Sequence, residues 1–171
     1  MAISTIPAAG LSSGVPTRAQ LPAGSVLQIA HTQSGVRDGT TTVLPIDTSI
    51  PQNTEGKEYL TLSITPTSST NTLLITVNTF LGLSPGNWGV IALFKDSAVD
   101  AIASTTTYMA TNTGGTVVSL TYSMVAGSTS STTFKLRYGP GTAGTCWISG
   151  SSGDLLGGTL RTTITIMEVA A

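Results

Sequence analysis

The chain has 171 residues, of which 40% are hydrophobic and 9% charged, and its formal net charge is −1. Disordered chains combine low hydrophobicity with high net charge, so disorder throughout is excluded, and the scattered cationic residues form no basic surface for a nucleic acid. No run reaches 18 apolar residues, so we expect no membrane partner.

Residues 1–24 carry Pro, Gly and isolated apolar side chains with no strand or helix period. Their spacing suits separate pockets on a partner better than one strand face. We therefore predict an extended N-terminal docking arm, followed by one domain over residues 25–171. The residues that we expect to dock are Ile3, Ile6, Pro7, Leu11, Val15, Pro16 and Leu21.

From residue 25 onward, short runs of Thr, Val, Ile, Leu and Tyr alternate with Gly, Pro, Asn and Asp-Ser, which is typical of strands and turns. No segment combines helical spacing with a cap and sufficient length. The fold class we predict is all-β, an antiparallel β-sandwich of jelly-roll type. Strands are expected near 25–31, 41–50, 59–65, 72–82, 88–95, 98–105, 116–126, 131–138, 145–149 and 159–169.

Two motifs match catalytic or cofactor patterns, yet each fails its structural requirement. Gly82 to Gly86 reads G-x-S-x-G, but Pro85 lacks the N–H that an oxyanion hole needs after the nucleophile Ser84. The second copy of this pattern, around Ser12, has no strand before it. Gly139 to Gly144 reads G-x-G-x-x-G, but a strand-like run follows it instead of a helix. We predict turns at these sites, no catalytic residue and no bound cofactor.

His31 is the single histidine and has no acidic neighbour in sequence, so a catalytic triad is not expected. Cys146 is also alone, which excludes an internal disulfide and multi-cysteine metal sites. Asp96 and Asp100 are the best candidates for a weak calcium site, but turn formation explains Asp96 more simply, and no metal is predicted. The first residues lack the cationic and apolar segments of a secretory signal, so we expect synthesis in a cytoplasm.

The aromatic side chains admit two interpretations, core packing or stacking on sugar rings. Trp88 stands in a run that is apolar on both faces, which favours the core. Trp147 lies beside the glycine-rich loop, and both interpretations remain open for it.

Five segments in order resemble a family of small tailed-bacteriophage virion proteins, often labelled tail-fibre-like. They are LPAGSVLQ (21–28), residues 60–77, residues 88–104, residues 117–138 and the ending TITIMEVAA (163–171). The resemblance implies a β-rich, commonly trimeric subunit on a virion surface, made in the cytoplasm of the host, with no catalytic residue.

A compact domain without heptads or repeats favours a capsid decoration (cement) protein that clamps the major capsid protein or other virion subunits. The alternative is a short tail fibre or receptor-binding subunit that recognises a host glycan, and an enzyme such as a glycan depolymerase is a distant third. We expect a homotrimer, because a chain with so few charges has little to keep its sheets apart.

Overall fold

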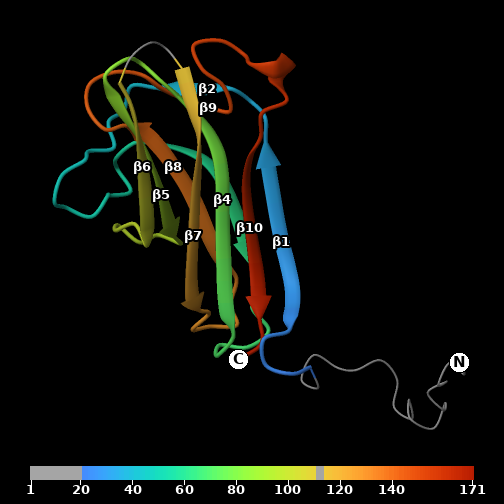
Figure 1. Ribbon diagram of the computed structural model, residues 1–171. Helices are drawn as coiled ribbons and strands as arrows, with labels where there is room; N and C mark the ends of the chain where they lie inside the picture. Colours follow the sequence, from blue (N-terminus) through green and yellow to red (C-terminus); the bar gives the residue numbers. More distant parts are fainter. Residues whose placement is uncertain (1–20, 111–113) are drawn as a thin grey trace, which may run out of the picture.

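The computed structural model describes residues 21–110 and 114–171, and it confirms an all-β antiparallel sandwich of two packed sheets (Figure 1). The strands are β1 (Val26–Ser34), β2 (Asp38–Thr40), β3 (Lys57–Ile64), β4 (Thr72–Leu83), β5 (Asn87–Lys95), β6 (Ala103–Met109), β7 (Gly114–Val125), β8 (Thr132–Pro140), β9 (Cys146–Ile148) and β10 (Thr162–Val169). A short 3₁₀ helix, η3 (Leu156–Gly158), precedes β10. Within the described residues, no helix is long and apolar enough to cross a membrane.

The larger sheet has six strands in the order β1-β10-β4-β9-β2, with β7 paired to the other side of β4. The second sheet has four strands in the order β3-β8-β5-β6. The turn before β4, the start of β1 and the end of β10 meet at one end of the sandwich, beside the C-terminus (Figure 1). We call this the C-terminal end.

Alternation along the strands of the six-stranded sheet builds one side of the core between the sheets. In β4, side chains at odd positions face inward and are buried, while Thr, Leu and Asn at even positions up to Asn78 are half-buried or exposed. Burial of every second side chain fixes the register, since a slip by one residue would turn the apolar set to solvent. The fully buried side chains include Leu73, Ile75, Val77 and Leu81 from one sheet and Ile91, Leu93, Phe134 and Leu136 from the other.

The expected strand at 41–50 is wrong. The chain leaves β2 at Thr40 and then runs as an irregular loop to Lys57. Pro45 and Pro51 lack the N–H groups that a strand ladder needs, and Asp47 forms a local turn in which the Ser49 N–H donates to its Oδ1 at 2.7 Å. Leu44 anchors this loop over the outside of the four-stranded sheet, where it is fully buried against Val90, Ala92 and Phe94.

Of the predicted docking arm, Leu21 to Gly24 lie inside the described residues, and Leu21 is 38% exposed. Backbone hydrogen bonds between Gly24 and Ala170 and between Ala170 and Ser25, both 2.9 Å, hold this segment to the end of the chain. Ile3, Ile6, Pro7, Leu11, Val15 and Pro16 lie outside the described residues. Docking by the arm therefore stays a prediction.

Candidate functional site

One face of the six-stranded sheet packs against the four-stranded sheet, and its other, outer face is a regular surface. Strand pairing aligns its side chains in rows across β1, β10, β4 and β7. From the C-terminal end upward, the rows are Val26, Val169, Thr72 and Val125; Ile29, Met167, Leu74 and Ser123; His31, Thr165, Thr76 and Thr121; Gln33, Thr163, Asn78 and Ser119; and finally Phe80 with Val117. We call this set the outer face.

None of the Asp, Glu, Lys or Arg residues that the structure describes lies on the outer face. They lie instead on the four-stranded sheet, at strand ends or in loops: Arg37, Asp38, Asp47, Glu55, Lys57, Glu58, Lys95, Asp96, Asp100, Lys135, Arg137, Asp154 and Arg161. Glu168 is on β10 but points into the protein and is fully buried. The outer face therefore combines hydroxyl and amide groups with aliphatic side chains and carries no fixed charge.

Large aliphatic side chains are exposed at both sides of this face. Ile29 on β1 is 62% exposed, and Val117 and Val125 on β7 are 70% and 58% exposed. Scattered apolar residues are common on protein surfaces, whereas large contiguous apolar patches often mark interaction sites.

The polar side chains of the outer face satisfy part of their hydrogen bonding within the face. The His31 Nδ1 and the Thr165 Oγ1 lie 2.9 Å apart, and the Ser119 hydroxyl donates to the Asn78 Oδ1 at 2.7 Å. Such pairs lower the cost of removing the face from water, because a buried polar group without a partner is destabilising.

A buried carboxylate lies behind the C-terminal end of this sheet. The Glu168 Oε1 accepts hydrogen bonds from the Thr67 N–H (2.7 Å), the Thr67 hydroxyl (2.8 Å), the Asn71 Nδ2 (2.6 Å) and the Ser68 N–H (3.4 Å). Its Oε2 accepts one from the Gln28 Nε2 at 2.6 Å. The Glu168 carboxylate thus connects β10 to β1 and to the turn between β3 and β4 by hydrogen bonds.

Burial by itself would raise the pKa of Glu168, but the hydrogen bonds from Asn71, Thr67 and Gln28 outweigh it and lower the pKa to about 2. Sequence reasoning missed this centre. The available signal was the alternation of β10, since a glutamate occupies a position whose equivalents at Thr162, Ile164 and Ile166 all face the core.

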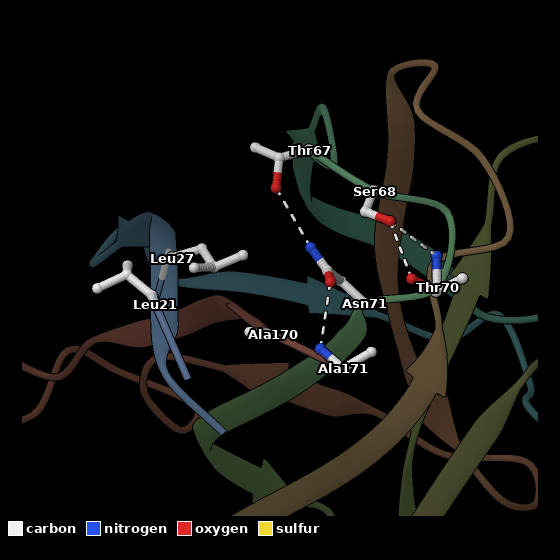
Figure 2. Close-up of a pocket in the computed structure, with 8 residues that line it drawn as sticks. All are labelled: Leu21, Leu27, Thr67, Ser68, Thr70, Asn71, Ala170 and Ala171. Carbon is white, nitrogen blue, oxygen red and sulfur yellow. Dashed lines mark hydrogen bonds between the residues drawn. The ribbon is translucent and has the colours of Figure 1, made fainter. Parts of the chain in front are cut away.

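A pocket of about 370 Å³ lies at the C-terminal end, and Thr67 and Asn71 both line it and bond the Glu168 carboxylate. Figure 2 shows the residues that line this pocket. Leu21, Leu27, Ala170 and Ala171 supply its apolar lining, and the hydroxyl groups of Thr67, Ser68 and Thr70 supply most of its polar lining. Asn71 lies between the two, where its Oδ1 accepts the Ala171 N–H at 3.3 Å. The side chains that line the pocket are aliphatic, hydroxyl-bearing or amide groups.

The two glycine motifs form turns, as predicted. Ser84 lies in the hairpin between β4 and β5, and its Oγ accepts the Thr145 N–H at 3.0 Å. The loop from Gly141 to Thr145 connects β8 to β9, so a strand follows it and no helix N-terminus is available for a phosphate. Ser12 lies outside the described residues.

The single histidine is far from Ser84. His31 pairs with Thr165, which pairs with Thr76 in the same row. Ser84 follows β4 about 25 Å further along that strand, at about 3.3 Å per residue. These two side chains therefore cannot form a nucleophile–base pair.

The remaining reactive and acidic candidates do not converge on one site. Burial raises the pKa of the Cys146 thiol to about 12, which keeps it protonated at neutral pH. The Asp96 Oδ1 accepts the Thr133 N–H at 2.8 Å, and the Asp100 Oδ1 accepts from the Gln52 Nε2 at 2.7 Å. Over residues 21–110 and 114–171, no three His, Cys, Asp or Glu residues are grouped as a metal site.

The expectation that Trp88 belongs to the core is wrong. Trp88 is 38% exposed on the outside of the four-stranded sheet, where its ring lies 4.8 Å from that of Tyr108. The alternation of β5 explains the difference, because Gly89, Ile91 and Leu93 take the positions that face the main core, while Val90, Ala92 and Phe94 on the opposite face are covered by the 41–56 loop. This loop leaves Trp88 only partly covered.

Among solved structures, the chain is similar to Eiger TNF from S. frugiperda, with a TM-score of 0.52, 9% identity, and coverage of 85% of this chain and 94% of that one. Latent PorU from Porphyromonas gingivalis aligns with a TM-score of 0.40, 11% identity, and coverage of 87% of this chain and 14% of that one. At these identities, the first similarity supports the fold alone. No curated protein matches the sequence.

The model of the Pgp3 C-terminal domain, a family of Chlamydia, matches residues 38–171. This match overturns the resemblance to bacteriophage virion proteins. The capsid decoration interpretation, the tail-fibre alternative and the virion-surface location are therefore wrong. The chain belongs to the family of the Pgp3 C-terminal domain.

Proposed function

We propose that this chain is a non-catalytic protein whose β-sandwich assembles as a homotrimer through the outer face. The observation that carries the proposal is the segregation of charge. Every described Lys, Arg, Asp and Glu lies off the outer face, although the four strands that form it run the length of the sandwich.

The energetics of burial favour association through this face. Removing apolar surface from water gains about 25 cal/mol per Å². Burying ionised groups costs several kcal/mol each unless they are paired, and on the outer face no Asp, Glu, Lys or Arg has to be buried. The net charge of −1 also leaves little repulsion between copies.

The position of the exposed aliphatic side chains favours a ring. Ile29 lies on β1 and Val125 on β7, at opposite sides of the sheet. A heterologous contact between the β7 side of one copy and the β1 side of the next covers both. Such contacts close into rings or continue as filaments, and three copies form the smallest ring.

The distance between His31 and Ser84, together with the protonated Cys146, supports the non-catalytic part of the proposal.

The test uses two variants that are matched in residue type and exposure. Val125 lies on the outer face, Val99 lies in the turn between β5 and β6, and both are 58% exposed. Light scattering after size-exclusion chromatography should give a three-chain mass for the wild type and for Val99→Asp, and a single-chain mass for Val125→Asp with unchanged circular dichroism. A trimeric Val125→Asp variant, or a monomeric Val99→Asp variant, would contradict the assigned face.

A further inference from the structure

The outer face contains one ionisable side chain, the imidazole of His31. His31 lies at the middle of β1 in the row with Thr165, Thr76 and Thr121, and it is the single histidine of the chain. Its side chain is exposed and contacts the Thr165 hydroxyl. Imidazole is the side chain whose charge ordinarily changes between pH 5 and 8.

No other titratable side chain faces His31 in the described part of the chain. On β10, Glu168 points to the opposite side of the sheet, and on β7, Tyr122 packs toward the core. β4 contains no titratable residue. On β3, which packs against β1 from the second sheet, Lys57 pairs with Asp38, Glu58 lies 3.7 Å from Arg137, and the Tyr59 hydroxyl bonds Ser34.

We propose that His31 makes the assembly sensitive to acid, so that protonation of its imidazole releases the trimer into single chains. This inference rests on the proposed trimer and concerns the regulation of the same face. A neutral imidazole fits among hydroxyl groups, since one nitrogen donates and the other accepts. A protonated imidazole brings a full positive charge into a face that has no carboxylate to pair with it.

The direction follows from linkage between protonation and assembly. In a free chain the exposed His31 ring is hydrated in either protonation state, whereas an assembled face without a carboxylate disfavours the charged form. The free chains therefore bind more protons than the trimer, and a fall in pH shifts the equilibrium toward them. Each of the three copies releases one proton on assembly. At pH values below the range in which histidine titrates, the association constant of the trimer therefore falls by up to about a thousandfold for each pH unit.

Other acid effects on the sandwich fall outside this range. The buried Glu168 remains ionised down to about pH 2. The other described Asp and Glu residues lie off the outer face, and carboxyl groups of model peptides have pKa values near 4. Dissociation between pH 7.5 and 5.5 with an intact fold therefore reports on His31.

The experiment measures the mass of the full chain by light scattering at one micromolar concentration, at pH 7.5 and pH 5.5, with circular dichroism as the control for folding. We expect a trimer at pH 7.5 and single chains at pH 5.5 for the wild type. His31→Gln should remain a trimer at both values, and His31→Lys should be a single chain at both.

The outcomes separate this inference from the proposed function. A wild-type trimer at both pH values would overturn the role of His31 and leave the proposed assembly standing. Single chains at both values would overturn the two together. If His31→Gln dissociates at pH 5.5 like the wild type, another group is responsible and the inference is wrong.

Discussion

Replacing Glu168 with Gln should destabilise the fold more than any other single loss of charge. The variant keeps the size of the side chain but replaces one carboxylate oxygen with an NH₂ group. If the amide oxygen takes the site that bonds Thr67 and Asn71, its NH₂ faces the Gln28 Nε2, which lies 2.6 Å from the present Oε2. Gln28 cannot turn over to relieve this, because its Nε2 also donates to the Thr65 carbonyl at 2.8 Å.

The magnitude follows from the pKa of Glu168. A fall from 4.5 to about 2 corresponds to about 3 kcal/mol of stability at neutral pH, at 1.36 kcal/mol per unit. Because the pKa is depressed in the folded state, this stability is complete above pH 4.5 and is lost as the pH falls toward 2. The difference in unfolding free energy between wild type and Glu168→Gln should therefore be about 3 kcal/mol at pH 7. At pH 3 this difference should be smaller by about 2 kcal/mol.

Urea unfolding at a fixed chain concentration measures this difference, and a fixed concentration matters because assembly contributes to apparent stability. The matched control is Glu58→Gln on β3. The Glu58 side chain is 41% exposed, and its Oε2 lies 3.7 Å from a guanidinium nitrogen of Arg137. This control should change stability by less than about 0.5 kcal/mol. A loss below about 1 kcal/mol for Glu168→Gln at pH 7, or a difference that does not change with pH, would refute the reasoning.

Two further predictions concern packing and the turn at Ser84. Gly115→Ala should lower stability by about 1–3 kcal/mol, because the added Cβ would lie 2.2 Å from the Phe80 ring and 2.7 Å from the Leu81 carbonyl oxygen. The control is Gly114→Ala, whose Cβ meets Met109 at an ordinary contact distance of 3.4 Å. Thermal unfolding compares them, and equal melting temperatures would contradict the close approach. Ser84→Ala should cost about 1 kcal/mol through its lost bond to the Thr145 N–H and leave the oligomeric mass unchanged. A stability equal to wild type in urea unfolding would show that this bond contributes nothing.

Much of the fold could be predicted from residue patterns alone. The alternation in β4 and β10 reflects one buried and one open sheet face, so it locates both strands within a few residues. The pattern failed at 41–50, where Thr, Val, Leu and Ile suit a strand, but Pro45 within the run and Pro51 directly after it prevent a ladder. The strand propensity of a residue does not account for its hydrogen bonds to a particular neighbouring strand. At 41–50 those hydrogen bonds decided the structure.

The outer face and the Glu168 centre required the register between strands. Nothing in sequence brings Ile29, Met167 and Leu74 into one row, because they belong to three strands separated by long stretches of chain. The partners of Glu168 likewise come from β1 and from the turn at Thr67 to Asn71. Composition predicted assembly, but only the paired strands place the uncharged surface on one side of the sandwich.

Sedimentation equilibrium of the unmodified full chain tests the central claim most directly. At pH 7.5 and over a range of micromolar concentrations, the account predicts one dominant species with three times the chain mass of 17.4 kDa. A species of 17.4 kDa at all concentrations would contradict assembly through the outer face, and a stable species of twice that mass would contradict the ring of three.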